Sequence, residues 1–163
     1  MALDTGLRAC GFAVVDDGTL VFAELVRSPE AFARGPRAWA TMVEAVLEAY
    51  PLAADLLVVE MPQYDGRTSV GGVAPDVFEV VGVAGRLLAA FTGRAQVAWS
   101  VTPQEWKKNL PKPVHHARLA EELSPEEALL VPDDHNVRDA VALALWAAKE
   151  RGERRPPEIW RPA

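Results

Sequence analysis

The chain has 163 residues, half of them hydrophobic and a quarter charged, which is typical of a single soluble globular domain and excludes an intrinsically disordered protein. The longest apolar run, Ala140 to Ala148, is far shorter than the roughly 20 residues that cross a bilayer. Because Cys10 is the single cysteine, it has no disulfide partner within the chain, and we expect a cytoplasmic protein. The net charge of −6 argues against a uniformly basic surface, but it allows a basic strip beside an acidic site.

The beginning of the chain has the pattern of antiparallel strands. Ala2-Leu3-Asp4 is short and apolar, and a second apolar run covers Gly11 to Asp16. Asp17-Gly18 predicts a hairpin turn because glycine tolerates a positive φ. We therefore expect Thr19 to Val26 to return as a third strand.

The middle of the chain predicts helices packed around a buried strand. After Gly35-Pro36, apolar residues recur at helical spacing on one face: Trp39, Met42, Val43, Val46, Leu47 and Tyr50. The continuous apolar run from Leu56 to Val59 is typical of a strand buried on both faces. A helix from about Pro75 to Phe91 and a strand from Ala95 to Ser100 follow.

Two capping boxes with proline at the first helical position predict short helices towards the end of the chain. They are Thr102-Pro103-Gln104-Glu105 and Ser124-Pro125-Glu126-Glu127, and a last long helix runs from about Asp134 to Glu150. Three antiparallel strands, a helix, then strand-helix-strand and closing helices predict one α/β domain over residues 1–163 with a mixed sheet. Residues 150–163 form a basic, proline-rich tail.

Three carboxylates lie where an element ends or where a helix faces inward. Asp4 lies in the first strand, and Glu60 ends the buried strand, at the edge where open α/β sheets place their sites. Asp139 lies in the final helix, with His135 one turn earlier at i−4. Each has an ordinary interpretation: Asp4 as a turn cap, Glu60 as the partner of an arginine, and Asp139 with His135 as first-turn helix residues.

The conjunction of the three carboxylates favours a metal site over those ordinary interpretations. A buried carboxylate is costly unless it is paired or binds a metal, and carboxylates that converge repel one another. A hard divalent cation relieves both costs. Two such ions about 3.5–4 Å apart can clamp the attacking water and the leaving oxygen of a phosphodiester.

Three segments resemble the RuvC-type Holliday junction resolvases of the ribonuclease H-like superfamily. They are Leu3-Asp4-Thr5-Gly6 through Gly11 to Asp16, Leu57-Val58-Val59-Glu60, and Asp139 to Ala144. Their order, their spacing and the chain length agree with the family, so the resemblance covers nearly the whole chain. It implies a ribonuclease H-like fold and a homodimeric, Mg²⁺-dependent endonuclease that nicks two strands of a four-way DNA junction symmetrically. Two ions are expected per active site, with Mn²⁺ able to substitute.

The resemblance also implies a set of metal ligands, namely Asp4, Glu60 and Asp139. The fourth ligand of the family is Asp or His at i−3 from the last aspartate, a position that Asn136 occupies here. We therefore assign the fourth position to His135, with Asp134 as the fallback and Asn136 as a weak oxygen ligand.

Two further departures from the family concern the start of the chain. Thr5 replaces the proline that usually follows the first aspartate. Very little chain precedes Asp4, so the first strand is short or its start is truncated. The short N-terminus and the compact length favour a phage-borne member, which would act in the host cytoplasm.

Basic residues gather between Pro103 and Arg118, where Glu105 is the one opposing acid: Lys107, Lys108, Lys112 and Arg118. Four cations beside a carboxylate cluster suit a groove that binds the DNA backbone. By resemblance, Lys107 and Arg118 fall on two basic positions that act near the scissile phosphate, the second being lysine in the family. Tyr64 lies near a family aromatic that stacks on a junction base, or else it packs on its own domain.

The helix of about residues 75–91 is apolar nearly all round, more than a helix needs to cover a sheet. Gly82 and Gly85 would permit close approach of another element. We expect the surplus face to be buried against a second copy, as in the dimer helix of the resembling family. The alternative cover is the tail, with Ile159 and Trp160.

The expected function is therefore metal-dependent resolution of four-way junctions by phosphodiester hydrolysis. Two alternatives are another two-metal ribonuclease H-like nuclease, acting on RNA or on packaging DNA, and a catalytically inert junction-binding protein with a decayed site. The Asp-x-Gly strand turn also resembles the phosphate loop of sugar-kinase and actin-like ATPases. Those proteins need two such domains, which 163 residues do not supply.

Overall fold

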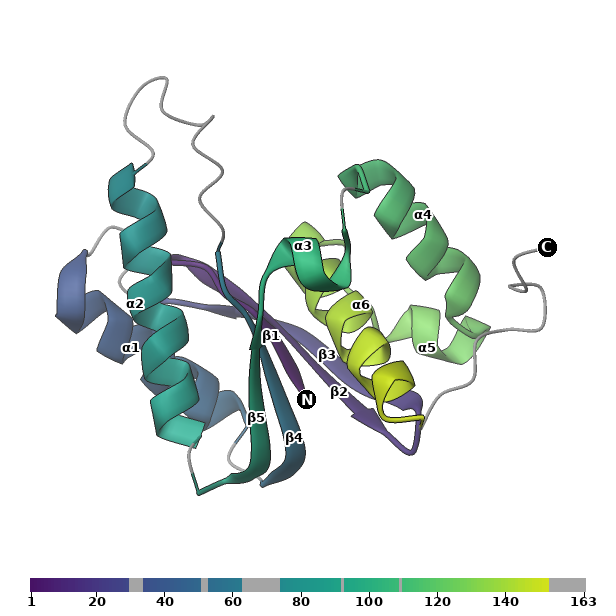
Figure 1. Cartoon of the computed structure of the whole chain (residues 1–163), viewed down its shortest axis with the longest axis horizontal. Helices are drawn as coiled ribbons and strands as arrows, with labels where there is room; N and C mark the ends of the chain where they lie inside the picture. The colour runs from purple at the N-terminus through teal and green to yellow at the C-terminus, as the bar shows by residue number, and fades with distance from the viewer. Residues whose placement is uncertain (30–33, 51–52, 63–73, 92, 109, 153–163) are drawn as a thin grey trace.

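A five-stranded mixed sheet forms the centre of the protein, as a computed structural model shows (Figure 1). Its strands are β1 (Ala2–Asp4), β2 (Ala9–Asp16), β3 (Thr19–Arg27), β4 (Ala54–Glu60) and β5 (Ala95–Val101). The first three pair antiparallel and the last two join in parallel, in the order β3-β2-β1-β4-β5. The predicted mixed α/β sheet is confirmed. The structure describes residues 1–29, 34–50, 53–62, 74–91, 93–108 and 110–152.

The hairpin between β2 and β3 has the turn that the sequence predicts. Asp17 and Gly18 both have positive φ angles, 50° and 77°, as a two-residue type I′ turn requires. This turn matches the twist of the two strands, so their ladder extends from the Asp16–Thr19 pair to the Ala9–Arg27 pair.

The sheet separates two hydrophobic clusters because successive side chains of a strand face opposite sides. Helices α1 (Gly35–Ala49) and α2 (Ala74–Phe91) cover one face, and α6 (His135–Glu150) covers the other (Figure 1). Leu3 packs in the cluster of α1 and α2, whereas Ala2 packs in the cluster of α6. Every residue from Leu56 to Glu60 is buried, which confirms the prediction that β4 is covered on both faces.

Three short helices lie on the α6 side of the sheet: α3 (Pro103–Trp106), α4 (Lys112–Glu122) and α5 (Pro125–Leu129). Both predicted capping boxes are present. The Glu105 carboxylate accepts the Thr102 backbone N–H at 2.6 Å, and Glu127 accepts that of Ser124 at 2.9 Å. The other Glu127 oxygen accepts the Leu20 N–H at 2.8 Å and so ties α5 to β3.

Helix α2 is less uniformly covered than its composition predicts. Val83, Ala84, Leu87 and Phe91 are buried under the sheet, but Phe78 is 72% exposed and Val81 is 37% exposed. A Cβ on Gly82 would meet the Trp39 ring of α1 at 2.6 Å, so this glycine allows α1 to approach α2 within the chain. Within the described residues, no helix is long and apolar enough to span a membrane.

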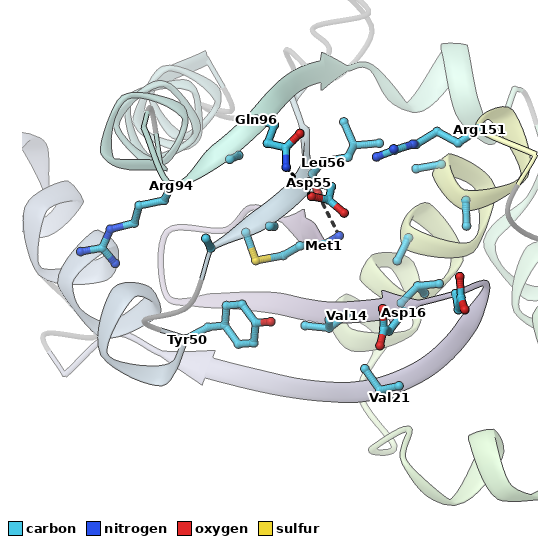
Figure 2. A pocket seen from close by; sticks show the side chains of 18 of the residues that line it. Met1, Val14, Asp16, Val21, Tyr50, Asp55, Leu56, Arg94, Gln96 and Arg151 are labelled. Atoms are coloured by element: carbon cyan, nitrogen blue, oxygen red, sulfur yellow. Dashed lines mark hydrogen bonds between the residues drawn. The ribbon is translucent and has the colours of Figure 1, made fainter.

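A groove lies between the end of β2 and the start of β4 (Figure 2). Met1 lines it, and the Met1 ammonium donates to the Leu56 carbonyl oxygen at 3.0 Å. The groove measures about 660 Å³ and is bordered by alanines of α6: Ala144, Ala147 and Ala148. It lies at the start of β4, whereas the predicted site residue Glu60 lies at the opposite end of that strand.

Helix α6 crosses β2 at Gly11, the residue that pairs with Asp4. A Cβ on Gly11 would lie 2.0 Å from the backbone oxygen of Asn136, so only glycine allows the start of α6 to approach this closely. This contact places the first turns of α6, and with them Asp139, over the carboxyl end of β1.

We predict that Gly11→Ala destabilises the protein by about 1–3 kcal/mol, the usual cost of forcing an extra methyl group into a packed contact. The matched control is Gly85→Ala, because a Cβ at Gly85 meets nothing within 4 Å and alanine favours helix by about 1 kcal/mol. Urea denaturation of both variants measures the difference. Equal stability of Gly11→Ala and the wild type would contradict the close contact.

Candidate active site

The three predicted carboxylates converge at the carboxyl ends of β1 and β4. Asp4 and Glu60 are register partners on these neighbouring parallel strands, and Asp139 approaches from α6. Their exposed fractions are 9% for Asp4, 9% for Glu60 and 2% for Asp139. Parallel register explains the first pair, since strands that end together place their last side chains at the same edge.

Lys107 lies between two of these carboxylates. Its Nζ is 3.3 Å from Glu60 Oε2 and 3.4 Å from Asp139 Oδ2, and its side chain is 14% exposed. Lys112, from the start of α4, places its own Nζ 3.3 Å from the same Asp139 oxygen but remains 51% exposed. Trp106 Nε1 donates to Glu60 Oε2 at 2.7 Å, which orients the Glu60 carboxylate.

The second oxygen of Asp139 faces a histidine. His116 Nε2 lies 2.9 Å from Asp139 Oδ1, and the histidine side chain is 16% exposed. The Asp139 carboxylate therefore has two different sides, with lysines at Oδ2 and an imidazole at Oδ1.

The three carboxyl groups differ in their pKa because they differ in their partners. Burial, followed by repulsion from Glu60 and Asp139, raises the pKa of Asp4 well above its usual value, and Lys107 and Lys112 do not offset this. Burial also raises the pKa of Glu60 despite Lys107 and the Trp106 hydrogen bond. Burial opposes the charge of Asp139 as well, but His116 and the two lysines outweigh it and lower the pKa of that carboxyl.

Lys107 supplies a positive charge that pairs with two of these carboxylates. Burial opposes its charge, but attraction to Glu60 and Asp139 outweighs burial and raises the pKa of the Lys107 ammonium. Asp4, by contrast, receives no hydrogen bond or ion pair from the described part of the chain. A buried carboxylate without a partner is unfavourable, and within the described residues Lys107 and Lys112 offset this cost for Asp4 only in part.

The donor set fits a hard divalent cation, whose preferred ligands are carboxylate oxygens. In the described residues, no three His, Cys, Asp or Glu side chains are grouped so that they could hold a metal ion as they stand. The Lys107 ammonium instead lies between Glu60 and Asp139. Binding of a cation by all three carboxylates therefore requires this lysine to move.

The three sequence-based candidates for the fourth ligand all lie at the start of α6. His135 is exposed at the first residue of α6 and makes no hydrogen bond or ion pair with any described residue. Asp134 is the N-cap of α6, and its carboxylate accepts the Asn136 N–H at 2.8 Å. No hydrogen bond of the Asn136 side chain is found within the described ranges.

The predicted DNA-binding residues fall into two groups. Lys107 and Lys112 contact the carboxylates directly. Lys108 and Arg118 are exposed on the segment that carries them. Tyr64 lies outside the described residues.

The sequence analysis missed Trp106 and His116, which contact Glu60 and Asp139. The sequence analysis considered only carboxylates and cations as site residues. Both Trp106 and His116 lie in the basic segment between Pro103 and Arg118 that it singled out. Trp106 directly precedes Lys107, and the pair His115-His116 contains two of the three histidines in the chain.

The fold is similar to that of solved resolvases. RuvC of Thermus thermophilus, in complex with a Holliday junction substrate, matches with a TM-score of 0.61 and 21% identity over 95% of this chain and 96% of that chain. Another Thermus thermophilus RuvC structure matches with a TM-score of 0.55 and 19% identity over 95% and 97% of the two chains. The yeast mitochondrial Holliday junction resolvase Ydc2 matches with a TM-score of 0.60 and 12% identity over 93% and 80%.

Comparison by sequence adds no relative, since no known family and no curated protein matches the chain. The similarity to the three structures nevertheless extends over 93–95% of this chain. The chain has the ribonuclease H-like fold of the RuvC-type Holliday junction resolvases.

Proposed function

We propose that the protein is a metal-dependent endonuclease that resolves four-way DNA junctions by symmetric phosphodiester hydrolysis. The observation that carries the proposal is the convergence of Asp4, Glu60 and Asp139, all nearly buried, at one edge of the sheet beside Lys107. The fold supports it, because the similar structures are junction resolvases and one of them is a complex with a junction.

The three carboxylates would hold Mg²⁺, or Mn²⁺ in its place. When bound, a pair of such ions supplies a nucleophilic hydroxide and neutralises charge on the phosphate and on the leaving oxygen. Asp4 and Glu60 orient their oxygens from two strands, and the Trp106 N–H fixes one Glu60 oxygen. Buried strand ends and a packed helix hold such groups more rigidly than loops do.

The lysines around Asp139 would bind the scissile phosphate. Lys107 and Lys112 reach the same Asp139 oxygen, so their ammonium groups are already gathered at the reaction site. Lys108 and Arg118 are exposed nearby in sequence and would contact the flanking backbone, where cations provide affinity without sequence preference. We assign Tyr64 the role of stacking on a base at the junction.

A homodimer would present two such sites to the two strands that are cut. A pseudo-symmetric junction suits a two-fold assembly. The exposed Phe78 and Val81 of α2 form an apolar face on the opposite side of the sheet from α6, and we assign the dimer contact to this face.

The first prediction concerns chemistry. Asp4→Asn and Asp139→Asn should each reduce cleavage of a labelled immobile four-way junction by at least about 100-fold, because even the outer partners of metal ligands contribute 10–100-fold. Binding of the junction, measured by gel shift, should persist, because the basic residues are unchanged.

The control for this experiment is Asp133→Asn, which changes a carboxylate that is 92% exposed at its side chain and pairs with Arg138. A linear duplex of the same sequence and an RNA–DNA hybrid are tested in parallel. Cleavage of these substrates at the same rate would assign the site to a general two-metal nuclease. Full activity of Asp4→Asn and Asp139→Asn would contradict the proposed site, and junction binding without cleavage by the wild type would indicate an inert binding protein.

The second prediction concerns assembly. Phe78→Glu should convert a dimer to a monomer in light scattering, because a charge replaces the most exposed aromatic of α2. It should also abolish paired nicks on one junction. Val21→Glu is the control, since Val21 is 47% exposed on β3, away from α2. A Phe78→Glu protein that remains dimeric would show that another surface forms the contact.

A further inference from the structure

His116 reaches the candidate active site from a different helix than the one that carries Asp139. Its Nε2 lies 2.9 Å from Asp139 Oδ1, although 23 positions separate the two residues in the sequence. The histidine side chain is 16% exposed and the carboxylate 2% exposed, so the contact is largely shielded from water.

We propose that His116 Nε2 is the fourth metal ligand of the site, next to Asp139 Oδ1. This inference rests on the proposed two-metal function. Mg²⁺ takes six ligands at 2.0–2.1 Å in octahedral geometry, so two adjacent ligand atoms lie about 2.9–3.0 Å apart. The separation of His116 Nε2 and Asp139 Oδ1, 2.9 Å, equals that spacing. The two atoms form a hydrogen bond here, so binding of one ion by both requires the imidazole to carry its proton on Nδ1 and to turn its Nε2 lone pair from Asp139 towards the ion.

The two oxygens of Asp139 support this assignment. Oδ2 faces Lys107 at 3.4 Å and Lys112 at 3.3 Å, which are groups suited to a phosphate. Oδ1 faces only His116 among the described residues. A cation is repelled by the ammonium groups at Oδ2, so the Oδ1 side is electrostatically the better position for it.

The candidates on α6 are less well placed than His116. Asn136, at i−3 from Asp139, has its backbone oxygen against Gly11 and its N–H on the Asp134 carboxylate. The Asp134 carboxylate accepts the Asn136 backbone N–H and so caps the helix. His135 is exposed, and it forms no hydrogen bond or ion pair with Asp139.

The packing of α4 explains why His116 points to Asp139. Leu119 is buried in the α6 cluster, and a residue three positions earlier lies on the same helix face. The residue before His116 also contacts the site: the centroid of the His115 ring lies 5.0 Å from that of the Trp106 ring, edge to face. Trp106 in turn donates to Glu60, so the orientation of α4 is coupled to the carboxylate cluster.

An imidazole ligand would also change the choice of metal. Carboxylates suit Mg²⁺ and Mn²⁺ alike, whereas imidazole favours transition metals over Mg²⁺. We therefore expect tighter binding of Mn²⁺ than of Mg²⁺, and we expect His116→Asp to reduce this preference while keeping a metal ligand at the position.

The test is metal binding by the full chain without DNA, so that its outcome does not depend on junction cleavage. Mn²⁺ titration by calorimetry gives the affinity, and pulsed electron paramagnetic resonance detects a nitrogen directly bound to Mn²⁺. His116→Gln should weaken Mn²⁺ binding by about 10–100-fold and remove the nitrogen signal. His135→Gln is the matched control, because His135 is exposed at the start of α6 and should leave the signal intact.

Three results would overturn the assignment: no nitrogen signal in the wild type, a signal retained in His116→Gln, or a signal lost in His135→Gln. His116→Asp distinguishes loss of a ligand from loss of folding, since it should recover Mn²⁺ affinity without the nitrogen signal. A protein that shows the His116-dependent signal but does not cut junctions would retain this inference while the proposed function fails.

Discussion

The buried carboxylate of Asp4 is the constraint on which the rest of the site depends. Burial, followed by repulsion from Glu60 and Asp139, raises the pKa of this carboxyl well above its usual value. Lys107 forms ion pairs with the other two carboxylates, and its charge offsets only part of the rise in the pKa of Asp4. Such an arrangement lowers stability unless a cation is added, and this cost is the physical argument for metal-dependent chemistry.

The fold enforces this unfavourable proximity through backbone contacts. The parallel register of β1 and β4 aligns Asp4 with Glu60, and the antiparallel register of β1 and β2 aligns Asp4 with Gly11. Because Gly11 has no side chain, the start of α6 contacts β2 and carries Asp139 to the same place. Two hydrophobic clusters, one on either side of the sheet, hold these strands and helices together.

Much of this arrangement could be predicted from the sequence because it is encoded by local patterns. The Asp17-Gly18 turn, the apolar run that ends at Glu60 and the capping boxes each specify one element, and the structure confirms them. The contact between His116 and Asp139 could not be predicted in this way, since it depends on how α4 packs against α6. The contact between Gly82 and Trp39 could not be predicted for the same reason, because Trp39 lies far away in sequence.

The most direct test of the central claim is the thermal stability of Asp4→Asn with and without Mn²⁺. Replacing the buried Asp4 carboxyl by an amide should raise the Tm of the metal-free protein at neutral and higher pH, where burial and repulsion from Glu60 and Asp139 disfavour the charged form. Mn²⁺ should raise the Tm of the wild type, because it binds the folded state, and should have little effect on Asp4→Asn. Asp55→Asn, at the exposed start of β4, should behave like the wild type. A lower Tm for metal-free Asp4→Asn, or an equal response of both proteins to Mn²⁺, would contradict the account.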